Sequence, residues 1–80
     1  MKLLVHKWVP CKRRDFIRKL KKHGFSDFET GGRHGIMRYR SYKQVIPSNR
    51  EYSVLQMKML LRQVKEKLNR DISVDEWNNL

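Results

Sequence analysis

The spacing of apolar residues predicts an amphipathic helix near the start of the chain, over residues 11–23. The residues of its apolar stripe are Phe16, Ile17 and Leu20. Basic residues occupy its other faces. Pro10 suits the beginning of this helix because its missing N–H needs no partner in a first turn. Gly24 suits its end because glycine readily adopts the left-handed conformation that terminates many helices.

A second, longer helix is predicted over residues 53–69, and a short third helix follows it. Apolar residues at helical spacing in the long helix are Met57, Leu61, Val64 and Leu68. Ser53 is expected to cap its N-terminus. The third helix is expected to begin at Ser73, because Ser73 and Glu76 have the spacing of a capping box, and to bury Trp77.

Three short strands are predicted between the first two helices, over residues 25–29, 35–41 and 42–46. Residues 30–32 are expected to form a turn, because consecutive glycines are found mainly where the backbone needs unusual φ angles. Pro47 is expected to end the third strand. A loop is then expected over residues 48–52.

The order of these elements predicts an α+β fold, in which helices cover one face of a small antiparallel three-stranded sheet. A chain of 80 residues is expected to form a single domain, over residues 10–80. Residues 1–9 are expected to form an N-terminal arm or an extra strand. Leu3-Leu4-Val5 is too short for the core of a signal peptide, and no apolar stretch approaches the roughly 20 residues that span a membrane.

The single cysteine, Cys11, excludes an internal disulfide and fits a reducing compartment, so we expect a cytoplasmic protein. Lys12, Arg13 and the start of a helix are expected to lower the pKa of its thiol. No matched base lies nearby in the sequence, so we expect no catalytic role for it.

The chain carries 19 Lys and Arg residues against 8 Asp and Glu residues, a net charge of +11. Residues 1–40 hold 12 of these basic residues and only 3 of the acidic ones. The densest cluster consists of Lys12, Arg13, Arg14, Arg18, Lys19, Lys21 and Lys22. This imbalance favours a polyanionic partner, nucleic acid above all, because binding to phosphates releases condensed counterions. An acidic protein partner remains the alternative.

The segment Gly31-Gly32-Arg33-His34-Gly35 is the strongest candidate for an active site. A histidine can accept and donate a proton near neutral pH, and a guanidinium can stabilise charge that develops on a phosphoryl group. The glycines would let the backbone approach a phosphate closely. The alternative is an ordinary glycine-rich hairpin turn with an exposed histidine.

No metal site is expected, because His6, Cys11, His23 and His34 lack the close spacing of metal ligands. Tyr39 and Tyr42 stand among basic residues, namely Arg38, Arg40 and Lys43. Such a mixture can stack and hold unpaired bases, although cross-strand packing explains the two tyrosines equally well.

Five motifs together resemble the HicA-type toxins. The stretch from Lys12 to Leu20, closing in His23-Gly24-Phe25, resembles their first helix. Gly31-Gly32-Arg33-His34 falls where that family carries Gly-Ser-His-His or Gly-Gly-Lys-His. The remaining matches are Val45-Ile46-Pro47-Ser48, Leu60-Leu61-Arg62-Gln63-Val64 and Asp71-Ile72-Ser73-Val74-Asp75-Glu76-Trp77.

This resemblance implies an α-β-β-β-α fold like that of a double-stranded-RNA-binding domain. It also implies an RNA-cleaving toxin of a toxin–antitoxin pair, inactivated by a HicB-type antitoxin. The family's catalytic histidine corresponds to His34. Arg33 keeps the charge of the Lys-bearing variants, whereas Gly35 stands where a second His or a Gln is common.

We therefore expect an endoribonuclease that cleaves mRNA with no metal or other cofactor, using His34 as general base or acid. Arg33 would hold the phosphate, and the three glycines Gly31, Gly32 and Gly35 would shape the turn. The residues expected to bind the RNA backbone are Lys12, Arg13, Arg14, Arg38, Arg40 and Lys43. The alternatives are a non-catalytic RNA-binding module and an interaction protein that docks an acidic partner.

Overall fold

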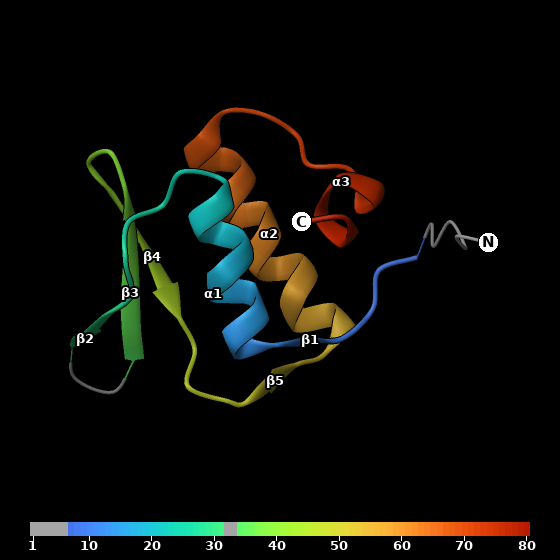
Figure 1. Ribbon diagram of the computed structural model, residues 1–80, viewed down its shortest axis with the longest axis horizontal. Coiled ribbons are helices and arrows are strands. Elements are labelled where there is room, and N and C mark those ends of the chain that lie inside the picture. The colour runs from blue at the N-terminus through green and yellow to red at the C-terminus, as the bar shows by residue number, and fades with distance from the viewer. Residues whose placement is uncertain (1–6, 32–33) are drawn as a thin grey trace.

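Two long helices packed on an antiparallel sheet form the framework of the structure (Figure 1). The computed structural model describes residues 7–31 and 34–80. The elements are β1 (Cys11–Lys12), α1 (Arg13–Lys22), β2 (Glu29–Gly31), β3 (His34–Tyr39), β4 (Tyr42–Ile46), β5 (Glu51–Tyr52), α2 (Val54–Leu68) and α3 (Val74–Asn78). The predicted α+β fold is confirmed, including the three-stranded sheet.

The sheet has the strand order β2-β3-β4, and all its pairs are antiparallel. In Figure 1, α1 and α2 lie on the same side of this sheet. Met37 pairs with Gln44, and both side chains are fully buried on the helix side. The buried amide of Gln44 is satisfied: its Nε2 donates to Oε1 of Gln63 at 2.9 Å, and its Oε1 accepts from Nζ of Lys67 at 2.9 Å. These bonds fasten β4 to α2.

A second, two-stranded sheet explains why α1 begins later than predicted. Cys11 pairs with Tyr52 and Lys12 with Glu51, so β1 and β5 occupy positions that were expected to be helix and loop. The predicted start of the helix at residue 11, with Pro10 in its first turn, is therefore wrong. Cys11 and Lys12 belong to an extended pair, and the helix follows directly from it.

The strand predicted over residues 25–29 is displaced, because β2 covers Glu29–Gly31. Ser26 bonds instead to the backbone of Arg38, donating its N–H at 2.8 Å and accepting at Oγ from the Arg38 N–H at 3.1 Å. Thr30 and Gly31, expected in a turn, pair with β3. Gly32 and Arg33, the rest of the predicted turn and a candidate phosphate-binding residue, lie outside the described residues. The turn near Ser41 is confirmed, with Arg40 at a left-handed φ of 55°.

Local signals at the helix ends are confirmed. Ser53 caps α2 and Ser73 caps α3, each accepting at Oγ from the N–H three residues later. The carboxylate of Glu76 pairs with Arg70. Gly24 follows α1 with a φ of 97°, the left-handed conformation expected of it.

The core lies between α1, α2 and the short elements that follow the sheet. Phe16 is fully buried, and its ring contacts those of Tyr52 and Trp77 with 5.4 Å between centroids in each pair. Of the predicted N-terminal arm, residues 1–6 lie outside the described part. Trp8 packs against the core, and Lys7 accepts a hydrogen bond at its carbonyl from Asn78. Among the described residues, no helix has the length and apolarity needed to cross a bilayer.

Gly35 provides a direct test of how the sheet packs. A Cβ at this position would lie 1.8 Å from Cε2 of Phe28, a distance that no packed atom pair tolerates. We expect Gly35→Ala to lower the free energy of unfolding by about 1–3 kcal/mol, through the cost of overpacking. Urea denaturation measures this change. In a Phe28→Ala background the same substitution should cost markedly less, and an equal cost in both backgrounds would contradict this packing.

Candidate functional site

His34 is the first residue of β3, and its side chain is exposed. It pairs with Gly31 at the end of the β2–β3 ladder. Because side chains alternate along a strand, His34 shares the open face of the sheet with Ile36 and Arg38, opposite the helices. An exposed imidazole at the end of a sheet can meet an extended substrate and exchange protons with it.

A chain of contacts joins the end of the sheet beside His34 to the start of α1. The ring of Phe28 covers Gly35, and the guanidinium of Arg13 lies over that ring, 4.7 Å from its centroid. Arg13 Nε also donates to the carbonyl of Pro47 at 2.9 Å. Arg13 is half-buried, and its guanidinium is engaged in these contacts within the fold. Gly35 is buried under Phe28, so the absence of a side chain there serves packing.

The other predicted cations at the start of α1, Lys12 and Arg14, are exposed. They line a groove of about 600 Å³ together with Arg13, Ser48, Arg50 and Glu51. Arg50 is a site residue that the sequence did not single out. It stands in a segment expected to be a loop, outside the basic cluster, and only the pairing of β5 with β1 brings it to the helix.

Arg38, Arg40 and Lys43 form a second basic group at the far end of β3. Arg38 pairs with Lys43 in the ladder, and its Nε lies 3.0 Å from Oε2 of Glu29. Arg40 lies in the turn, with its guanidinium 5.4 Å from the centre of the Tyr39 ring. Arg38 lies four positions beyond His34 along β3, about 13 Å away at the usual rise of a strand. The predicted RNA-binding residues thus fall into two groups, one at each end of the sheet.

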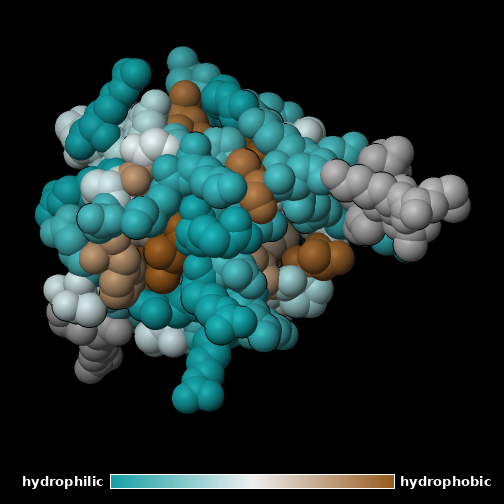
Figure 2. Space-filling model, viewed as in Figure 1, coloured by the Kyte–Doolittle hydropathy of each residue, from teal (hydrophilic) through white to brown (hydrophobic). Residues whose placement is uncertain are grey.

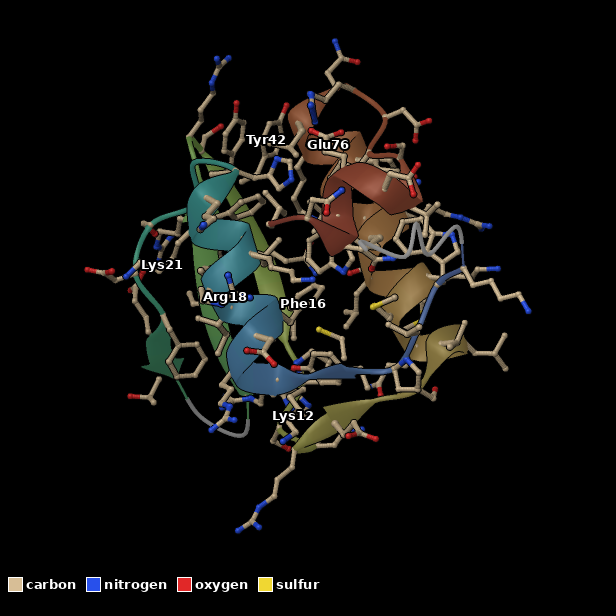
Figure 3. All side chains as sticks on the ribbon, turned by 45° about the vertical axis from the view of Figure 1, so that its right-hand side comes forward. Lys12, Phe16, Arg18, Lys21, Tyr42 and Glu76 are labelled. Atoms are coloured by element: carbon tan, nitrogen blue, oxygen red, sulfur yellow. The ribbon has the colours of Figure 1, made fainter. Side chains whose placement is uncertain are left out.

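Three further cations of α1 make contacts within the fold, and two of them bind the C-terminal segment. Arg18 donates to the carbonyl of Leu80 at 3.2 Å, and Lys19 donates to that of Trp77 at 3.0 Å. The ammonium of Lys19 also lies 5.2 Å from the centre of the Trp77 ring, and burial lowers its pKa. Lys21 pairs with Asp27 at 2.7 Å. With Arg13 included, four of the seven cations in the basic cluster therefore make contacts within the fold. Figure 3 labels two of them, Arg18 and Lys21.

Tyr39 and Tyr42 face each other across β3 and β4, and their environments differ. Tyr39 is half-buried and packs against Phe25, with 5.3 Å between ring centroids. Tyr42 is 52% exposed. Cross-strand packing accounts for Tyr39, whereas the ring of Tyr42 is accessible to a base.

Cys11 differs from the prediction. Its side chain is buried in β1, and burial raises the pKa of its thiol, outweighing the opposite effect of the nearby Lys19. The expected lowering is wrong because the thiol is buried, and its desolvation outweighs the attraction of the nearby cations. In residues 7–31 and 34–80, no group of three or more His, Cys, Asp or Glu side chains is placed to hold a metal ion.

The two described histidines have opposite environments. His23 stacks on Trp77, with 6.4 Å between ring centroids and 9° between ring planes. Its Nε2 is buried without a hydrogen-bond partner among the described residues. Burial lowers the pKa of His23 from its ordinary value of 6.5, against the opposing attraction of Glu76. His23 is therefore a packing residue, and of the two described histidines His34 is the one exposed to a substrate.

The pKa of His23 predicts how stability depends on pH. Below about pH 6.5 the unfolded chain binds a proton that buried His23 resists, so acidification favours unfolding. The free energy of unfolding should fall as the pH drops below about 7.5, through the ordinary pKa of histidine and on to the lowered pKa of His23. His23→Phe keeps a ring on Trp77 and should reduce this fall, as measured by urea denaturation at each pH. Identical pH dependence in the two proteins would contradict the assignment.

Comparison with protein-family models, with curated proteins and with solved structures found no match to this chain. The likeness to HicA-type toxins therefore rests on the sequence motifs quoted above. The order α1-β2-β3-β4-α2 agrees with the fold that this likeness implies.

Proposed function

We propose that this chain is a metal-independent endoribonuclease that cleaves mRNA and acts as the toxin of a toxin–antitoxin pair. The observation that carries the proposal is the exposed His34 at the end of β3, on a basic α+β domain with the expected element order. The resemblance of Gly31-Gly32-Arg33-His34 to the corresponding motif of HicA-type toxins supports the proposal from the sequence. The substrate, the lone thiol and the charge together favour a cytoplasmic protein.

His34 would act as the general base of a transesterification. The neutral imidazole removes the proton of a ribose 2′-OH, and the oxygen attacks the adjacent phosphorus. The bond from phosphorus to the 5′-oxygen breaks, leaving a 2′,3′-cyclic phosphate on one product. The departing 5′-oxygen takes a proton from water, and the hydroxide that remains takes the proton from the imidazolium, which returns His34 to its neutral form. Arg33 would stabilise the charge on the phosphoryl oxygens.

The two basic groups would hold the RNA on either side of His34. Arg38 and Lys43 share the open face of the sheet with His34, and Lys12 and Arg14 lie at the start of α1. Each phosphate contact releases counterions, so binding should weaken steeply with salt. A HicB-type antitoxin would inactivate the protein by covering His34 and this basic surface, and its binding face would need to be acidic.

Substitution of His34 tests this proposal. We expect His34→Ala to abolish cleavage of a single-stranded RNA while leaving RNA affinity nearly unchanged, because the imidazole transfers protons and the cations supply binding. Gel analysis of labelled RNA measures cleavage, and fluorescence anisotropy measures binding. His23→Phe is the matched control, since it removes a histidine that faces the core, and it should retain cleavage.

Three results would contradict the proposal. Cleavage that persists in His34→Ala would show that another group performs the proton transfer, and loss of cleavage with EDTA would point to a metal. If wild type binds RNA but cleaves none under any condition, the chain is instead a non-catalytic RNA-binding module.

A further inference from the structure

The groove beside the start of α1 brings together two segments that are distant in the sequence. The backbone N–H of Arg13 donates to the carbonyl of Arg50 at 2.9 Å, which holds the β4–β5 link against the first turn of the helix. Lys12 and Arg14 line the groove from the start of α1, and Ser48 and Arg50 line it from the β4–β5 link. Lys12 lies at the foot of α1 beside β5 (Figure 3).

The cations of this groove take part in no ion pair among the described residues. Within the described part of the chain, ion pairs engage Arg18, Lys21, Arg38, Lys65 and Arg70. Lys12, Arg14 and Arg50 take part in none of them, although Glu51 lies in the same groove. Arg13 contributes a further positive charge from its half-buried position. Four cations thus face one carboxylate across a concave surface, an arrangement that attracts an anion.

The groove is close to His34 but separate from it. The last pair of the β3–β4 ladder is Gly35 with Ile46, so one further step along each strand brings His34 beside Pro47. Ser48 follows Pro47 in the chain and enters the wall of the groove. A strand of RNA whose reactive phosphate lies at His34 can therefore continue past Pro47 into the groove.

We infer that this groove binds a backbone phosphate of the RNA next to the scissile one, with Arg50 and Lys12 as its principal ligands and Ser48 as a hydrogen-bond donor. This inference rests on the proposed function. The cations without ion pairs among the described residues carry it, and the helix start adds a smaller attraction, because Lys12, at the N-cap, makes no side-chain hydrogen bond to the first turn. The groove would fix the register of the RNA, while His34 performs the chemistry.

Salt-dependent binding to a cleavage-deficient protein tests the groove. The full chain carrying His34→Ala is titrated into a short fluorescent single-stranded RNA at several salt concentrations, with and without Arg50→Gln. We expect Arg50→Gln to weaken binding roughly fivefold and to reduce the slope of log affinity against log salt by about 0.7, the value of one phosphate contact on a single strand. Lys12→Gln, in the same groove, should act similarly.

Arg62→Gln is the matched control, because Arg62 is an exposed arginine of α2 in a different groove. It removes the same charge and should change neither the affinity nor the slope. Thermal unfolding of every variant checks that the fold is kept. In the protein with intact His34, Arg50→Gln should raise KM and leave kcat nearly unchanged.

Equal effects of Arg50→Gln and Arg62→Gln would overturn the inference, because they would show that RNA affinity depends only on the net charge of the protein. The inference would also be overturned if neither Arg50→Gln nor Lys12→Gln changed RNA binding. In that case, cleavage by wild type would still support the proposed function. If RNA binding depends on Arg50 and Lys12 but wild type cleaves no RNA, the phosphate-binding role of the groove is supported and the proposed nuclease activity is contradicted. If the protein that carries only His34→Ala binds no RNA, both the inference about the groove and the proposed function are contradicted.

Discussion

The contact of Phe16 with Tyr52 and Trp77 is the interaction on which the rest of the structure depends. Phe16 is fully buried, its ring meets that of Tyr52 nearly edge-on at 81°, and that of Trp77 lies at 54° to it. One side chain of α1 thereby fixes β5 and α3, two elements too short to be stable alone. Aromatic pairs of this kind contribute about 0.5–1.5 kcal/mol beyond the burial of their area. The surface around this core is largely hydrophilic, as Figure 2 shows for one face of the molecule.

This core also determines the geometry of the candidate site. The buried hydroxyl of Tyr52 donates to the carbonyl of Pro47 at 2.6 Å, and Arg13 donates to the same oxygen. That carbonyl follows directly on β4, so two bonds tie the end of the sheet to the start of α1. Phe28 packs between Gly35 and Arg13 and so also connects the end of the sheet to the start of α1. The basic groove and His34 thus keep a fixed relation to each other, which a nuclease requires for alignment of its substrate.

Features with a local cause could be predicted from the sequence. The serine caps of α2 and α3, the glycine after α1 and the end of β4 before Pro47 all depend on neighbouring residues. The β1–β5 pair could not be predicted, because two-residue strands have no periodicity and their pairing joins distant segments. The wrong expectation for the pKa of the Cys11 thiol follows from this unpredicted pair, because Cys11 is buried in β1. Lys19 belongs to the basic cluster of the sequence, but no sequence pattern shows that it donates to the carbonyl of Trp77. The glycine-rich context makes His34 a candidate from the sequence alone, whereas Arg50 becomes a candidate only through the fold.

The central claim is that His34 makes this chain an RNA-cleaving toxin. Its most direct test is expression of the wild-type chain and of His34→Ala in cells from a tightly controlled promoter, followed by growth measurement and mapping of transcript ends. The account predicts that wild type arrests growth and fragments mRNA, leaving 2′,3′-cyclic phosphate ends, and that the variant, expressed to the same level, does neither. Intact transcripts and unimpaired growth with wild type, or equal fragmentation by both proteins, would contradict it.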